Sequence, residues 1–159
     1  MSWRMIGKPI ATADVTAVPS ITQRFQVTSG NSLLRGVSVG VIFYNDPAFT
    51  ALSLELWSDR ASGAGALIAT SSNSYTKVQC LEGENSAYKI LGFTFQDLPI
   101  KDNSFYRLAL RPTVYTGDAT AHIAWRLSYP DPQYRTGLTL NAAKGANSPF
   151  EFSIISAVI

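Results

Sequence analysis

The stretch Leu34 to Tyr44, LRGVSVGVIFY, constrains the fold more than any other part of the sequence. Its apolar positions Val37, Val39, Val41 and Phe43 recur at every second residue. A period of two is typical of a β-strand, because successive side chains of a strand point to opposite faces of the sheet. A strand with one fully apolar face usually lies at the centre of a sheet that packs face to face on another. The stretch therefore predicts a β-sandwich.

Other segments with the same alternation supply the neighbours of this strand, and residues that favour turns separate them. Strands are expected at residues 21–27, 34–44, 52–57, 66–71, 88–95, 105–111, 121–127 and 150–159. In the segment 105–111, the alternating Tyr and Leu residues point into the core. This direction leaves Arg107 and Arg111 on the outer face of the sheet.

Two shorter segments, residues 78–81 and 138–140, are candidates for further short strands, whereas residues 97–103 are expected to form a loop. No segment has convincing helical periodicity. About eight strands, with a long connection at residues 129–148 before the last of them, are typical of an antiparallel jelly-roll or Greek-key β-sandwich. We therefore predict an all-β protein with one such domain at residues 21–159.

Residues 1–20 are expected to form an extended N-terminal arm in front of the sandwich domain. They have neither helical nor sustained strand periodicity, and two prolines forbid a continuous helix. The arm carries apolar side chains that need cover, among them Trp3, Met5, Ile6 and Ile10. Two arrangements are open at this point: the arm lies on its own domain, or it lies on a neighbouring subunit.

The composition limits the classes of partner. Charged residues make up 15% of the chain, below the usual roughly 25%, which suits a surface that packs against other proteins. The 13 basic residues form no stripe, so we expect no nucleic-acid partner. No run approaches the roughly 18 apolar residues of a membrane span, and the N-terminus lacks the apolar segment of a secretory leader. We expect a protein made in a cytoplasm, without a membrane partner.

Catalytic residues are not indicated by the sequence. The single histidine, His122, lies in mid-strand and is expected on the surface, and the single cysteine, Cys80, is expected to be a small buried side chain. Glycoside hydrolysis needs two carboxylates across a cleft, and no spacing selects a pair. The candidate carboxylates are Glu55, Asp59, Glu82, Glu84 and Glu151. We expect a non-enzymatic protein.

Metal and cofactor sites are not expected either. Asp46, Asp97 and Asp102 could contribute oxygen ligands to a calcium ion, but the chain has no Asp-rich loop that would gather them.

Aromatic residues are the best candidates for a binding role. Trp57 alternates away from the inward leucines of its strand, and Tyr44 has a similar position on the central strand, so both are candidates for the outer face. Tyr129 and Tyr134 lie in the long connection. Such rings could stack on a sugar, although burial against another protein segment is favoured, because protein interfaces are rich in Tyr and Trp. Trp125 belongs to the inward set and is expected in the core.

Three segments carry a resemblance to a known family. They are QRFQVTSGNSLLRGVSVGVIF at residues 23–43, LSLELWSDRASGAGALIATS at residues 52–71 and FTFQDLPIKDNSFYRLALR at residues 93–111. Their order resembles that of carbohydrate-binding-module-like jelly rolls, and Trp125, Gly137 and the final FEF motif fit the same pattern. The resemblance covers residues 21–159 and consists of hydrophobic positions and turns, so it concerns the fold more than the function.

The resemblance implies a role in a virus particle. Sandwiches of this kind occur in tailed phages as capsid decoration proteins and as tail-fibre or baseplate modules. The chain begins at Met1 without a secretory leader or an attached catalytic domain, which favours a free-standing virion component. We expect a capsid decoration or cement protein whose partners are other virion proteins, namely the major capsid protein or copies of itself. The alternative is a module that recognises a cell-surface glycan.

Overall fold

The structure is a computed structural model, and it describes most of the sandwich. The described residues are 3–5, 22–27, 30–61, 63–115, 117–118, 120–126, 138–141 and 152–158. For residues 3–5, 126, 138–141, 152–153 and 158 the description covers the backbone alone.

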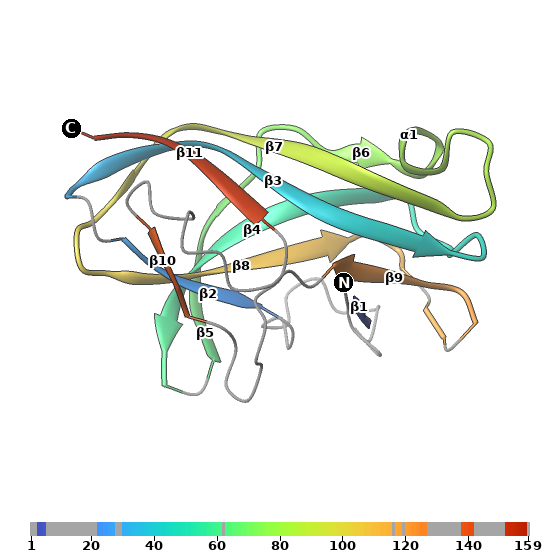
Figure 1. The fold of residues 1–159 in the computed structure, drawn as a ribbon, viewed down its shortest axis with the longest axis horizontal. Helices are drawn as coiled ribbons and strands as arrows, with labels where there is room; N and C mark the ends of the chain where they lie inside the picture. Colours follow the sequence, from blue (N-terminus) through green and yellow to red (C-terminus); the bar gives the residue numbers. More distant parts are fainter. Residues whose placement is uncertain are drawn as a thin grey trace.

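Two antiparallel sheets form the two layers of the molecule (Figure 1). Sheet A contains β1 (Trp3–Met5), β3 (Ser32–Tyr44), β7 (Ala87–Ile100), β9 (His122–Arg126) and β11 (Phe152–Val158). Sheet B contains β2 (Gln23–Val27), β4 (Ala51–Arg60), β5 (Gly63–Thr70), β6 (Tyr75–Thr76), β8 (Phe105–Pro112) and β10 (Leu138–Asn141).

Strand β3 is the centre of sheet A, as its sequence predicts. One of its edges pairs with β7 along almost its whole length, from Ser32 to Phe43. The other edge pairs first with β11 and then, from Val41 to Tyr44, with β9. Every backbone group of a buried strand needs a partner, and this arrangement supplies one on both sides.

The connections between the strands have the pattern of a jelly roll. Strands that follow one another in the sequence mostly lie in opposite sheets, as β2, β3 and β4 do and as β7 to β11 do. Hydrogen-bonded neighbours, such as β2 and β8 or β3 and β7, are far apart in the sequence. This confirms the predicted all-β, antiparallel sandwich.

The core lies between the inner faces of the two sheets. The inward positions of β3 are all buried, and so are those of β4 and β8 that face them. Trp125 on β9 and Phe25 on β2 are fully shielded from solvent. The inward set predicted from the alternation of residues 37–43, 52–56 and 106–110 is therefore correct.

Two local predictions are wrong. Residues 78–81 are not a strand but most of a short helix, α1 (Lys77–Leu81), which begins with a capping box between Thr76 and Gln79. The segment 97–103 is not one loop, because β7 continues to Ile100 and only the residues after it turn. The candidate strand at residues 138–140 is present as β10.

The beginning of the arm belongs to sheet A. Residues Trp3 to Met5 pair with Arg126 to Ala124 of β9 in the same chain, so this part of the arm lies on its own domain. The prediction that the arm has no strand is wrong for these three residues. Residues 6–20 lie outside the described residues.

Candidate functional site

The outer face of sheet A presents apolar side chains to solvent. On β7, Tyr88 is 40% exposed and Ile90 is 67% exposed, and on β11 Ile155 is 61% exposed. Strand pairing sets Ile42 beside Tyr88, so the side chains of neighbouring strands form one surface. We call the outward side chains Ile42, Tyr44, Tyr88, Ile90 and Ile155 the apolar face.

Glycines make the middle of this face flat. Gly40 pairs with Ile90, and Gly36 lies opposite Ile155, whose side chain would be 3.7 Å from a Cβ at position 36. A Cβ at Gly92 would meet its nearest neighbour, the Ser38 hydroxyl, only at 4.0 Å. No charged residue occupies an outward position of β3 from 36 to 44 or of β7 from 88 to 94. A flat, uncharged and partly exposed apolar surface suits contact with another protein.

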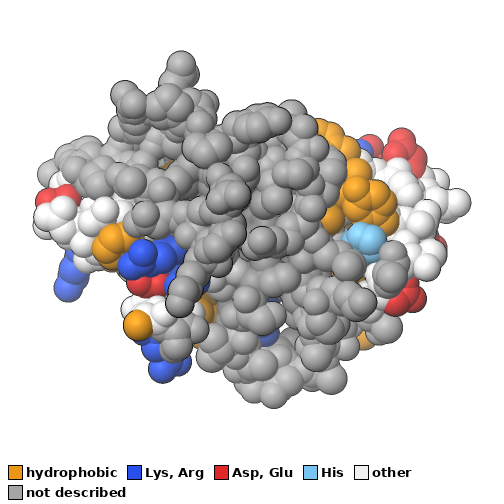
Figure 2. Space-filling model, turned by 60° about the horizontal axis from the view of Figure 1, so that its bottom comes forward, with side chains coloured by type: hydrophobic (Ala, Val, Ile, Leu, Met, Phe, Trp, Pro, Cys, Tyr) orange, Lys and Arg blue, Asp and Glu red, His pale blue; other side chains and the backbone are white. Residues whose placement is uncertain are grey.

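Tyr44 lies at the margin of the apolar face. The centre of its ring lies 4.7 Å from the centre of the His122 imidazole. The two residues are direct partners in the pairing of β3 and β9. Figure 2 shows the single histidine beside a band of hydrophobic side chains. The Nδ1 atom of His122 is buried, and among the described residues it has no hydrogen-bond partner. Tyr44 is half-buried, so it contributes the edge of a binding surface and not a free ring.

The outer face of sheet B is built differently, because its charged side chains are paired and shielded. Asp59 accepts hydrogen bonds from the Nε atoms of Arg24 at 2.9 Å and Arg107 at 2.7 Å. Arg107 also donates to the Thr22 hydroxyl, and the Arg24 guanidinium lies 3.8 Å from the centre of the Phe105 ring. Asp59 thus ties β2 and β8 to β4 through two ion pairs, which is a structural role.

Trp57 points to this outer face but is only 6% exposed. It packs with Ala64 and Ala109, and its indole Nε1 donates to Glu55 at 3.0 Å. Glu55 also lies 3.3 Å from the Nε of Arg111. Burial raises the pKa of the Glu55 carboxyl, while the Trp57 hydrogen bond and the Arg111 charge oppose that rise. The expected outward direction of Trp57 is correct, but the ring is not available for stacking on a sugar.

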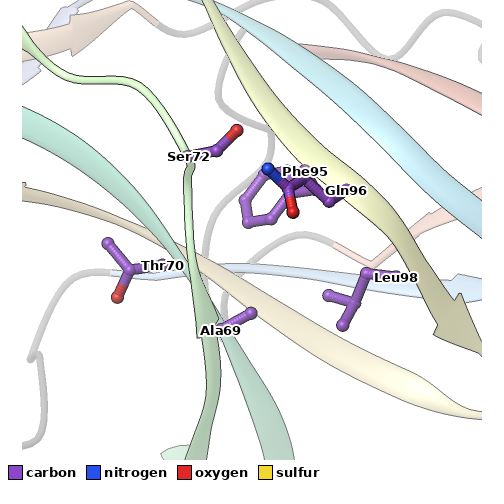
Figure 3. A pocket seen from close by; sticks show the side chains of 6 residues that line it. All are labelled: Ala69, Thr70, Ser72, Phe95, Gln96 and Leu98. Carbon is purple, nitrogen blue, oxygen red and sulfur yellow. The ribbon is translucent and has the colours of Figure 1, made fainter.

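A shallow groove opens on one side of the sandwich, between β5 and the last part of β7 (Figure 3). Its volume is about 280 Å³. Figure 3 shows the Phe95, Leu98 and Ala69 side chains directed into it, while Thr70 turns away. The lining residues are Ala69, Thr70, Ser72, Phe95, Gln96 and Leu98. We call this feature the side groove.

A bulge in β7 shapes the side groove. Leu98 pairs with Leu34 and Thr94 with Gly36, so residues 95–97 all lie opposite Arg35. Asp97 has a left-handed backbone with φ of 44°, and its carboxylate accepts a hydrogen bond from Arg35 Nε at 2.8 Å. Such bulges redirect a strand and are frequent next to binding sites.

Other candidate residues have structural roles. Cys80 is fully buried, and burial raises its pKa to about 11, so its thiol stays protonated at neutral pH. Among the described residues, no three His, Cys, Asp or Glu side chains gather in a way that could hold a metal ion. Among the described residues, no helix is long and apolar enough to cross a membrane.

The predicted partner-binding residues are therefore distributed over several places. Trp3 and Met5 lie in β1, for which only the backbone is described. Ile6, Ile10, Tyr129 and Tyr134 lie outside the described residues. Sequence reasoning missed Tyr88, Ile90 and Ile155. For Tyr88 and Ile90, the apolar residues on both faces of the segment 88–95 were a usable signal.

Comparison with known proteins does not place the chain in a family. Neither the protein-family models nor the curated proteins give a match to this chain.

Proposed function

We propose that the protein is a non-enzymatic structural component of a virus particle, most specifically a capsid decoration or cement protein of a tailed phage. The observation that carries the proposal is the apolar face of sheet A. An exposed apolar surface that carries no charged side chain at the outward positions of residues 36–44 and 88–94 favours a role in which another protein covers it. The jelly-roll resemblance of the sequence supports the particle as the setting.

The mechanism would be passive. The apolar face would pack against a neighbouring subunit, either the major capsid protein or another copy of this chain. Each contact is small, with three strongly exposed apolar side chains at Tyr88, Ile90 and Ile155. Repetition over a symmetric shell makes small contacts strong, because each bound subunit raises the effective concentration of the next contact.

Co-sedimentation tests this proposal. The purified chain is mixed with intact particles from the source of the sequence, from which the native copy has been stripped. We expect saturable binding that Gly92→Arg abolishes, because the new side chain has room on the face and adds a charge there. The matched control is Val78→Arg, on a side chain that is 76% exposed on α1. Absence of binding by the unchanged protein, or equal binding by Gly92→Arg, would contradict the proposal.

The alternative proposal is a glycan-binding module, as in cell-surface recognition by a tail fibre or baseplate. Tyr88 favours it, since its exposed ring on a sheet face could stack on a sugar. A carbohydrate array distinguishes the two proposals. A reproducible signal that Tyr88→Ala removes would support the glycan role. Absence of any signal at high protein concentration would favour the structural role.

A further inference from the structure

Two arginines lie directly opposite each other on the outer face of sheet B. Arg24 of β2 pairs with Arg107 of β8, and directly paired residues share one face of a sheet. The Cβ atoms of such partners are about 5 Å apart, and like charges in this arrangement destabilise a sheet. The two cations therefore need anions beside them.

Asp59 of β4 supplies only part of the compensating charge. Its carboxylate accepts one hydrogen bond from the Nε of Arg24 and one from the Nε of Arg107. The side chains of Arg24, Asp59 and Arg107 are 31%, 11% and 14% exposed. Glu55, a second carboxylate of β4, is already paired with Arg111 at 3.3 Å. Among the described residues, the cluster of two guanidinium groups and one carboxylate thus keeps an excess positive charge.

Several guanidinium donors of the cluster remain open. An arginine side chain has five N–H groups. Among the described residues, Arg24 donates only through Nε, and Arg107 donates through Nε and through Nη1 to the Thr22 hydroxyl. In the part of the chain that the structure describes, the one buried side-chain atom without a partner is Nδ1 of His122. The open amino groups of both arginines are therefore in contact with solvent.

Contacts within the fold hold both guanidinium groups in place. The Arg24 guanidinium lies over the Phe105 ring, 3.8 Å from its centre, and its Nε is 2.9 Å from Asp59. Arg107 is held by Asp59 at 2.7 Å and by the Thr22 hydroxyl at 2.8 Å. A ligand that binds here does not have to order two long side chains, which lowers the entropy cost of binding.

We propose that Arg24 and Arg107 form a binding site for a carboxylate group. A carboxylate carries the single negative charge that the cluster lacks, and its two oxygens match the paired N–H groups of a guanidinium. It would accept hydrogen bonds from the amino groups that Asp59 leaves open. A phosphate dianion would instead leave the cluster with excess negative charge. The inference goes beyond the proposed function and does not depend on it.

An acetate titration followed by NMR tests the site in the unchanged protein. The side-chain N–H signals of the arginines are recorded while sodium acetate replaces sodium chloride at constant ionic strength. We expect saturable shifts for Arg24 and Arg107. Arg35 is the matched control, because its Nε donates to one carboxylate, that of Asp97, at 2.8 Å and this pair has no excess charge. No saturable shift at Arg24 and Arg107, or an equal shift at Arg35, would overturn the proposal.

Arg24→Gln tests the role of the more exposed guanidinium. The change leaves Asp59 paired with Arg107, so we expect the variant to fold, with thermal unfolding as the check. Loss of a charge-assisted hydrogen bond should weaken acetate binding, measured at the Arg107 signal, by about tenfold or more. Arg35→Gln should bind acetate as the unchanged protein does. Equal acetate affinity of the two folded variants would contradict the proposal.

A second probe distinguishes the source of the carboxylate, which can be a free acid or a side chain of another protein. The probe is a glycine–glutamate–glycine peptide with blocked ends, compared with the same peptide in which glutamine replaces glutamate. Binding of acetate and of the glutamate peptide would support a site open to a protein side chain, and binding of acetate alone would support a site for small acids. Equal binding of the glutamine peptide would exclude recognition of a carboxylate.

Discussion

The Glu55 and Arg111 pair on the outer face of sheet B allows a sharp test of the structure. Both side chains are 11% exposed, their Nε and carboxylate atoms are 3.3 Å apart, and Glu55 also accepts from Trp57 at 3.0 Å. Arg111→Met keeps the length of the side chain and removes its charge. The Glu55 carboxylate would then remain on a shielded face with one hydrogen bond left.

The expected cost follows from these contacts. Removing one partner of a buried ion pair costs about 3–5 kcal/mol. Both side chains keep some contact with solvent, which lowers the desolvation penalty, so we expect a loss near the lower end of this range, about 3 kcal/mol. Glu55→Gln in the Arg111→Met background should recover most of this loss, because Gln still accepts from Trp57 and carries no charge.

The stability deficit of Arg111→Met should also depend on pH, in a direction that the pKa of Glu55 sets. Burial already raises the pKa of Glu55 in the folded protein, so the folded state binds more protons than the unfolded state and stability falls as pH rises above about 4.5. Loss of the Arg111 cation raises this pKa further. The deficit of Arg111→Met should therefore grow between pH 4 and pH 8 in denaturant titrations. A deficit below about 0.5 kcal/mol, or one that does not change with pH, would refute the geometry of the pair.

Three further predictions concern the core, the thiol and the last strand. Val41→Asp places an unpaired charge at a fully buried position, so we expect a loss of about 4 kcal/mol or more, and an unchanged melting temperature would show that the register is wrong. Because the pKa of Cys80 is raised to about 11, stability should fall by roughly 2 kcal/mol as pH rises from 9 to 11, and Cys80→Ala should flatten this fall in denaturant titrations. Truncation before Phe152 removes the strand that pairs with β3 from Ser32 to Val39, so we expect insoluble protein, and a soluble folded product would show that β11 is dispensable.

Much of the sandwich could be predicted because alternation is a local property. Val37, Val39, Val41 and Phe43 alternate in the sequence, and in the structure all four point into one core. The helix α1 was missed although its capping box is visible in the sequence, because the apolar residues of such a short run also fit a strand. The extension of β7 to Ile100 results from the pairing of residues 98–100 with residues 32–34 of β3 beyond the bulge, and these residues are far apart in the sequence.

The candidate surfaces depend on the arrangement of strands, which alternation does not specify. Trp57 was correctly expected to point away from the core, but its burial results from Ala64, Ala109 and Glu55, brought to it by neighbouring strands. The side groove exists because, among the described strands, β5 ends one sheet and β7 ends the other. A sequence shows strands, but it does not show which of them have no neighbour.

The proposed structural role is tested most directly by a cryo-electron microscopy map of intact particles from the source of the sequence. We predict repeated density for the sandwich on the particle, with Tyr88, Ile90 and Ile155 of the apolar face in contact with a neighbouring subunit. Particles that lack such density, or that hold the sandwich with this face open to solvent, would contradict the proposal.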